Sequence, residues 1–252
     1  MRSQSERRAV SDVLAFVIVF SIIITSVGVT YGIGFSSLSE FQEGEQKTNA
    51  ARAFQALSVS LDDIQEGAAP GRSGAIQLSE GTLQVDDESQ MTVEVTLSNG
   101  TTWTVASETT GSLQYSFENT DVAYENGAVF RKDGSASVMI EEPSFLCSES
   151  TDQAVVSIVV LNSDSNAIGG EINAEIISRQ NDTDVLYPNL SRGSSVTADS
   201  VTVDVPTSNF DQAWTRYFED TDGWEDPDSD GDFTCDADNV IVRVTFVEVE
   251  FQ

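Results

Sequence analysis

The sequence predicts an α+β protein: a long N-terminal helix, transmembrane at first and amphipathic after, followed by an antiparallel β-sandwich-like head. One observation is that residues 13–35 form an uncharged run of 23 residues, long enough to cross a bilayer as a helix. The other is that apolar and polar residues alternate from residue 75 onward, between short turn signals. We therefore expect a transmembrane helix over residues 10–35, a helical extension over 36–66 and an acidic β-rich domain over 75–252.

The flanks of the apolar run predict its orientation. Arg2, Arg7 and Arg8 precede it, whereas acids outnumber bases in the segment that follows. Because basic flanks stay in the cytoplasm, we expect the N-terminus inside the cell membrane and the head outside. A secretory signal peptide would have an apolar region of about 7–15 residues ending at a small-x-small site. The run here is longer and has no clean site of that kind, which favours a retained membrane segment.

The helical extension has an apolar face. Phe54, Leu57, Leu61 and Ile64 are spaced at i, i+3, i+7 and i+10, which places them on one side of a helix. The glycine- and proline-containing segment 67–74 ends this pattern. The sequence therefore predicts one long N-terminal helix, half in the membrane and half amphipathic.

Several strands are predicted in the head. Asn99-Gly100 lies between residues 91–97 and 102–105, and Asn126-Gly127 lies between residues 122–124 and 128–130. Each of these two pairs of segments is therefore predicted to form a β-hairpin. Further strands are expected over 153–161, 171–178, 195–205 and 240–251. In the last, the apolar phase shifts by one residue near Phe246, which indicates a β-bulge. About ten short strands favour an antiparallel sandwich or a partly closed barrel.

The charge balance is strongly acidic. The chain has 42 acids and 12 bases, a net charge of −30, and its acids are dispersed from Glu40 onward. Such a folded domain repels itself in ordinary salt, whereas molar salt shortens the Debye length to about 3 Å and screens the repulsion. The composition is therefore typical of adaptation to high salt. Beyond the first eight residues no basic patch exists, so nucleic acid is not an expected partner.

The absence of histidine bears on catalysis. The chain has none, which excludes histidine-based triads and histidine-ligated metal sites. Chemistry by carboxylates alone, as in a glycosidase, needs two placed acids, and no pair here stands out. We therefore predict that the protein is not an enzyme. We also expect no cofactor, except calcium if the acidic segment near the C-terminus binds it.

The N-terminal motif is Arg7-Arg8-Ala9-Val10-Ser11-Asp12-Val13, followed at once by the apolar run. In this respect the sequence resembles archaeal, and particularly haloarchaeal, type IV pilins and their pilin-like relatives. The resemblance implies a leader over residues 1–9, recognised around Arg8 and cut by a prepilin peptidase between Ala9 and Val10, with the helix retained. The sequence departs from the family pattern at Asp12, where proline is usual. An uncleaved signal anchor is the alternative.

Three residues are candidates for helix assembly. Gly28 and Gly32 form a small-xxx-small pair that permits close contact between helices. The resemblance implies that Asp12 pairs with the freed α-amine of a neighbouring subunit's Val10. Asp12 also fits a simpler role, as an acid in the first turn that complements the helix N-terminus.

An acidic segment near the C-terminus carries part of a calcium motif. Asp226, Asp228, Asp230 and Asp232, with Gly231, match the start of a calcium-binding loop, in which oxygen ligands alternate before a glycine turn. The closing glutamate is missing, because position 237 is Ala237, although Asp236 or Asp238 could substitute. Two interpretations remain open: a calcium site, or a solvated acidic loop in a chain rich in acids.

The two cysteines, Cys147 and Cys235, favour one disulfide, since the head is expected outside the cell. Two buried free thiols are the alternative.

Three sequons are candidates for N-glycosylation: Asn99-Gly-Thr101, Asn181-Asp-Thr183 and Asn189-Leu-Ser191. All are expected in exterior turns. Because Asn99 also fits as the hairpin turn residue, Asn181 and Asn189 are the better candidates.

These patterns together predict a function. The resemblance implies a type IV pilin-like subunit that serves surface structure or adhesion, and the large head favours a minor pilin over a bulk subunit. Its expected partners are the membrane, the prepilin peptidase, and other pilin-like subunits or copies of itself. The alternative is a monomeric, membrane-anchored extracellular binding module, calcium-dependent if the loop binds calcium. That module would keep its helix in the bilayer and its leader uncut.

Overall fold

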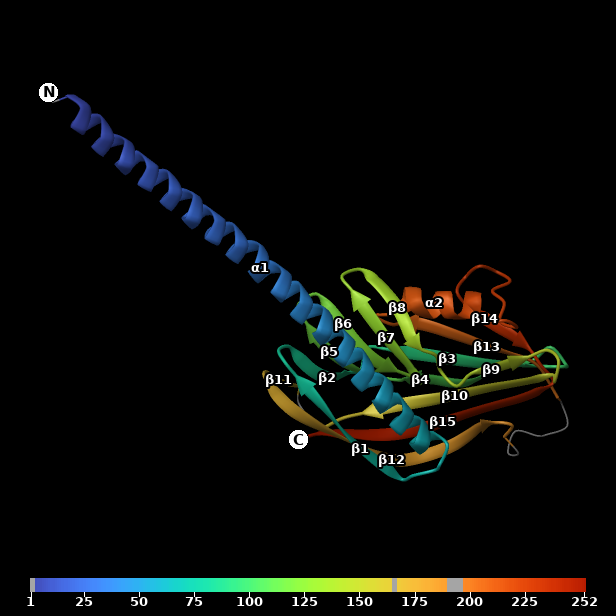
Figure 1. The fold of residues 1–252 in the computed structure, drawn as a ribbon. Helices are drawn as coiled ribbons and strands as arrows, with labels where there is room; N and C mark the ends of the chain where they lie inside the picture. Colours follow the sequence, from blue (N-terminus) through green and yellow to red (C-terminus); the bar gives the residue numbers. More distant parts are fainter. Residues whose placement is uncertain (1–2, 165–166, 190–196) are drawn as a thin grey trace. The chain divides into compact units, whose positions relative to one another are not determined.

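The structure, a computed structural model, describes residues 3–164, 167–189 and 197–252, with the side chains of residues 3–12, 36 and 39 outside the described part. The chain forms two compact units, Met1–Thr48 and Asn49–Gln252. One helix, α1 (Ser3–Gln65), begins in the first unit and ends in the second (Figure 1). The expected membrane helix and helical extension are therefore one continuous helix, which Gly44 does not interrupt.

The end of α1 follows the sequence signal. Gly67 adopts a φ of +75°, a left-handed conformation that glycine reaches without strain. Its N–H bonds the carbonyl of Ile64 at 3.0 Å, which closes the last turn. The helix thus ends one residue before the predicted boundary.

The head is built mostly from strands. Its described elements are β1 (Gly71–Leu78), β2 (Thr82–Asp86), β3 (Gln90–Leu97), β4 (Thr102–Thr109), β5 (Ser112–Phe117), β6 (Thr120–Glu125), β7 (Ala128–Asp133), β8 (Ala136–Glu141), β9 (Leu146–Ser148), β10 (Gln153–Asn162), β11 (Ile168–Gly169), β12 (Ile172–Tyr187), β13 (Ala198–Thr207), α2 (Asp211–Asp220), β14 (Phe233–Asp236) and β15 (Asn239–Phe251).

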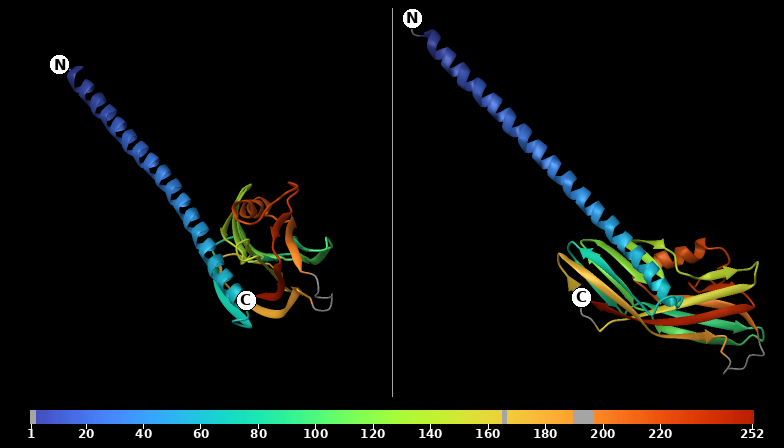
Figure 2. Two further views of the ribbon diagram at one scale, coloured as in Figure 1. Left: turned by 90° about the vertical axis from the view of Figure 1, so that its right-hand side faces the viewer. Right: turned by 60° about the horizontal axis from the view of Figure 1, so that its bottom comes forward.

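The strands form three sheets. The central sheet has the order β1-β12-β15-β10-β9, a six-stranded sheet the order β11-β2-β5-β6-β7-β8, and a four-stranded sheet the order β14-β13-β3-β4. Helix α2 packs against β8 and β13, and the views in Figure 2 show it beside the curved sheets. The expected α+β plan, a long helix followed by a β-rich head, is confirmed at this level.

The prediction of an antiparallel head is wrong at one pair of strands. Strands β10 and β15 run parallel, from Gln153 beside Asn239 to Asn162 beside Glu248, while the other pairs in the described part are antiparallel. A parallel pair needs a long crossover connection. Here β11 to β14 and α2 lie between the two strands in sequence and supply it.

Both predicted hairpins are present. Asn126 and Gly127 have positive φ angles of 48° and 87° and join β6 to β7 as a two-residue turn. The side chain of Asn126 is buried, and its Oδ1 accepts the N–H of Val159 on β10 at 2.7 Å. In the other hairpin, between β3 and β4, Asn99 Oδ1 accepts the N–H of Thr101 at 2.9 Å.

Two apolar cores lie on opposite faces of the central sheet. Val240, Val242 and Val244 of β15 belong to the core shared with α2 and the four-stranded sheet. Val247 and Val249 belong to the core shared with α1 and β1. The six-stranded sheet contributes to both cores.

This division explains the apolar phase of β15. The strand pairs with β10 in unbroken register, so β15 itself has no bulge there, contrary to the prediction. The register shift lies instead on the neighbouring strand β12, between Gln180 and Asp182. These two residues pair with Val247 and Phe246 of β15. The apolar phase changes because the core covers one face of β15 in its first half and the other face in its second.

Strands β12 and β13 both end later than predicted. Strand β12 runs nine residues past the predicted end at 178, to Tyr187. Strand β13 covers Ala198–Thr207, and residues 195 and 196 of its predicted range lie outside the described residues.

Candidate functional site

The most unusual surface of the described chain is the N-terminal part of α1. Large apolar side chains from Val13 to Phe41 are exposed, with exposed fractions between 50% and 73%. They lie on all sides of the helix, because most positions between residues 13 and 35 are apolar. By length and composition, this is one helix in the described chain that could cross a membrane. Water is a poor solvent for such a surface.

Two serine side chains within this segment bond the helix's own backbone. The Ser21 hydroxyl donates to the carbonyl of Val17 at 2.7 Å, and the Ser26 hydroxyl donates to the carbonyl of Ile23 at 2.9 Å. A hydroxyl that bonds its own helix exposes no unpaired donor to lipid or to a neighbouring helix. These two hydroxyls are therefore compatible with an apolar environment.

The residues predicted for processing and assembly all lie in α1. Arg8, Ala9, Val10 and Asp12 are helical, but their side chains are outside the described part. Gly28 and Gly32 lie on the open surface, and a Cβ at either position would meet no atom within 4 Å. The two glycines therefore leave a flat area that another helix could approach closely.

The other end of α1 is buried in the head. Phe54, Leu57, Leu61 and Ile64 are at most 6% exposed and belong to the second core, as the helical spacing predicts. Val59, on the opposite side, is 61% exposed. The same helix thus has an exposed apolar segment at one end and a core-forming face at the other.

A disulfide links two sheets of the head. Cys147 on β9 and Cys235 on β14 are bonded, with their Cα atoms 5.9 Å apart. The bond joins an edge of the central sheet to an edge of the four-stranded sheet. Gly223 lies against it with a φ of +91°, and a Cβ there would be 2.7 Å from Cys147 Sγ.

The acidic segment uses its carboxylates to bond its own backbone. Asp226 accepts the N–H groups of Asp230 and Gly231, each at 3.2 Å, and Asp230 accepts the N–H of Asp232 at 3.3 Å. Burial and the neighbouring carboxylates of Asp230, Glu94 and Asp226 raise the pKa of Asp232. In the described residues no group of three or more acidic, cysteine or histidine side chains is placed to hold a metal ion. Calcium binding by Asp226, Asp228, Asp230 and Asp232 stays a prediction.

The sequons lie in different settings. Asn181 is exposed but sits within β12 at the register shift, so the expectation of a turn is wrong there. Its sequon partner Thr183 accepts a bond from Gln180 Nε2 at 2.8 Å. Asn189 is exposed beyond the end of β12, and position 191 of its sequon is outside the described residues. Asn99 is the hairpin turn residue.

Sequence reasoning missed a buried carboxylate at Glu125, which is 1% exposed. It accepts bonds from the Ser89 hydroxyl at 2.6 Å, the Ser208 hydroxyl at 2.8 Å and the indole Nε1 of Trp214 at 2.8 Å. Burial raises its pKa, while these three donors oppose the rise. The available signal was an acid at the end of the apolar strand before Asn126-Gly127.

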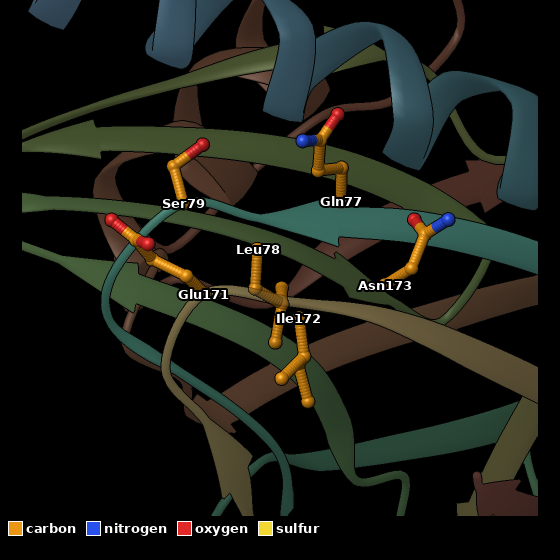
Figure 3. Close-up of a pocket in the computed structure, with 6 residues that line it drawn as sticks. All are labelled: Gln77, Leu78, Ser79, Glu171, Ile172 and Asn173. Atoms are coloured by element: carbon orange, nitrogen blue, oxygen red, sulfur yellow. The ribbon is translucent and has the colours of Figure 1, made fainter.

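A polar groove lies where β1 ends and β12 begins. Figure 3 shows its six lining residues: Gln77, Leu78, Ser79, Glu171, Ile172 and Asn173. Gln77 and Asn173 are cross-strand partners, and both are exposed. The groove offers amides, a hydroxyl and a carboxylate for hydrogen bonding at the sheet margin.

The chain matches one protein-family model over residues 8–250. It belongs to DUF7289, a family of unknown function. The DUF7289 match begins at Arg8, so it includes the apolar part of α1 together with the head. Comparisons with curated proteins and with solved structures gave no match.

Proposed function

We propose that this DUF7289 protein is a pilin-like surface subunit, anchored and assembled through its N-terminal helix, with its head outside the cell. The observation that carries the proposal is the dual character of α1. Its residues 13–35 expose an uncharged apolar surface, while Phe54, Leu57, Leu61 and Ile64 are built into the core of the head. Such a helix connects an apolar environment directly to a folded domain.

The exposed apolar segment of α1 must be shielded from water. Exposed apolar area costs about 25 cal/mol per Å² in water, so a surface of this extent is stable only in lipid or against other helices. Lipid covers it before assembly and neighbouring subunits cover it afterwards. The open surface around Gly28 and Gly32 gives such neighbours a place of close approach.

The N-terminus supports processing of the pilin kind. Arg7-Arg8-Ala9-Val10 precedes the apolar run, and a cut after Ala9 would remove a basic leader while leaving the helix whole. Asp12 would then lie in the first turn of the mature chain.

The head fits a structural or adhesive role in a salty exterior. Its disulfide suits an oxidising compartment. Its acids are dispersed over a chain of net charge −30. We propose that this head carries out no turnover, and that Glu125 is a structural carboxylate held by Ser89, Ser208 and Trp214.

A second candidate function is a monomeric binding module anchored by the same helix. The observation that favours it is the groove at the β1–β12 margin, which presents Gln77, Ser79, Glu171 and Asn173 as hydrogen-bonding groups. This module would remain a single copy in the membrane.

Shearing of intact cells separates the two functions. A pilin-like subunit appears in the sheared, high-molecular-weight fraction, and Ile23→Asp in the exposed apolar segment removes it from that fraction. Val59→Asp, an exposed position on the same helix but within the head, is the matched control and leaves the sheared fraction unchanged. Protein that stays wholly in the membrane fraction, in wild type as well, would support the anchored module instead.

A further inference from the structure

Half of one face of the central sheet is left uncovered by α1. Gln65 at the end of α1 donates from Nε2 to the carbonyl of Ser157, midway along β10, at 3.1 Å. On one side of this point, Val159 and Val247 are fully buried beneath the helix. On the other side no described element covers the face, and its side chains are exposed or half-buried.

The uncovered residues form a continuous surface, which we call the outer patch: Leu146, Val155, Val185, Ile241 and Arg243. Strand register places Leu146 beside Val155, Val155 beside Ile241, and Val185 beside Arg243. Leu146, Ile241 and Val185 are 43%, 45% and 56% exposed. The chain has a net charge of −30, yet this exposed apolar surface extends over four strands. Such a surface indicates a site that binds another surface.

The one charged residue of the outer patch, Arg243, indicates which kind of partner surface would fit. The Nε of Arg243 donates to the Ser157 hydroxyl at 2.7 Å, which fixes the guanidinium among the apolar side chains. Among the described residues Arg243 forms no ion pair, whereas Arg72, Arg131 and Arg179 each pair with an acid. The complementary partner is therefore an apolar surface with one carboxylate.

The chain itself has such a surface in α1. Leu38 and Phe41 are 55% and 65% exposed, and Glu45 follows at the spacing that completes one helical face. Glu43 pairs with Lys47 at 2.8 Å, but Glu45 forms no ion pair among the described residues. The same sheet face already accepts a helix, because α1 packs on its other half through Phe54 and Ile64.

We infer that the outer patch binds residues 38–45 of α1 from a second copy of this chain, with Glu45 of that copy opposite Arg243. This inference rests on the proposed assembly and adds to it a specific contact between helix and head. Leu38 and Phe41 would cover Ile241 and Val155, which continues the helix-on-sheet packing of the chain's own α1 onto the free half of the face.

Crosslinking of the full-length protein in native membranes tests the contact. One tagged copy carries Phe41→Cys and a second, differently tagged copy carries Ile241→Cys, while the native cysteines remain bonded to each other. Oxidation is expected to give a heterodimer that contains both tags. Matched controls replace one partner with an exposed apolar position outside the contact, Val59→Cys on the helix or Ile172→Cys on β12.

Charge reversal gives a second readout. Arg243→Glu and Glu45→Arg each lower the crosslinked fraction, by about fivefold for a loss of about 1 kcal/mol, and the two together restore it. Arg179→Glu makes the same charge change on the opposite face of the sheet and leaves crosslinking unaltered. Restoration by the double variant also shows that the single variants fold.

The outcomes separate this contact from the assembly it rests on. Equal crosslinking at the control pairs, or none at Phe41 and Ile241 while the two tags still copurify, would overturn the contact and leave assembly through the apolar helix standing. Failure of the tags to copurify under any condition would overturn both.

Discussion

The carboxylate of Glu125 accepts the indole N–H of Trp214 at 2.8 Å, which ties the β6–β7 hairpin to helix α2. Both residues are about 1% exposed. The Ser89 and Ser208 hydroxyls also donate to this carboxylate, from just before β3 and from the connection between β13 and α2. One buried acid thus fixes three separate parts of the head.

Removal of this acid should destabilise the head. Glu125→Ala leaves the Trp214 N–H without its acceptor in the core, and an unsatisfied buried donor costs about 1–3 kcal/mol. The expected loss, measured by urea unfolding, is at least about 2 kcal/mol, because three bonds are lost. Glu125→Gln keeps an oxygen for Trp214 and loses less. Glu88→Ala, at an exposed acid, is the control; a Glu125→Ala loss no larger than the control's would contradict the role.

The stability of the head should depend on pH through Asp62. Burial, with the nearby carboxylates of Glu66, Glu141 and Asp63, raises the pKa of Asp62 from 3.8 to about 6. The folded state therefore holds this proton more tightly than the unfolded state, and stability falls as pH rises from 3.8 through about 6. Asp62→Asn should flatten this part of the profile relative to wild type in thermal unfolding. An unchanged slope would show that Asp62 does not cause it.

Local and non-local features of the fold differed in how well the sequence predicted them. The Asn126-Gly127 hairpin and the face of α1 with Phe54 and Ile64 were predicted, because turn chemistry and helical spacing act over a few residues. The parallel pairing of β10 and β15 was not, because it depends on a crossover that spans β11 to β14. The apolar phase of β15 was misread as a bulge, since one strand contributes to two cores.

The candidate sites were likewise predictable where they depend on local sequence and not where they depend on distant contacts. The exposed apolar segment of α1 was evident from composition alone. The burial of Glu125 was not, because its donors come from residues 36, 83 and 89 positions away in sequence. The outer patch was equally hidden, because its exposure depends on where α1 ends over the central sheet.

The disulfide leaves no space at Gly223. Gly223→Ala would place a Cβ 2.7 Å from Cys147 Sγ, whereas Gly231→Ala, also at a left-handed glycine, meets no atom within 4 Å. Both substitutions pay the conformational cost of a positive φ, so their difference reports the collision alone. Gly223→Ala should lower the unfolding midpoint clearly more than Gly231→Ala. Equal effects would place the disulfide farther from this turn.

The packed end of α1 should contribute strongly to stability. Leu61 is 1% exposed in the core beside the central sheet, and Leu61→Ala should cost about 2–5 kcal/mol by loss of burial and creation of a cavity. Val59→Ala on the exposed side of the same helix should change stability by less than about 0.5 kcal/mol. Denaturant unfolding measures both, and a Leu61→Ala effect as small as that of Val59→Ala would mean that α1 does not pack on the head in solution.

The proposed pathway is tested most directly at the N-terminus. Intact mass and N-terminal sequencing are measured on protein from native membranes of cells with and without the prepilin peptidase. The proposed function predicts a mature chain that starts at Val10 and keeps all of residues 13–35 in peptidase-containing cells, and an uncut chain in cells without it. A chain that still carries Arg8 and Ala9 in both strains would contradict processing as a pilin-like subunit and leave a protein anchored by an uncut helix.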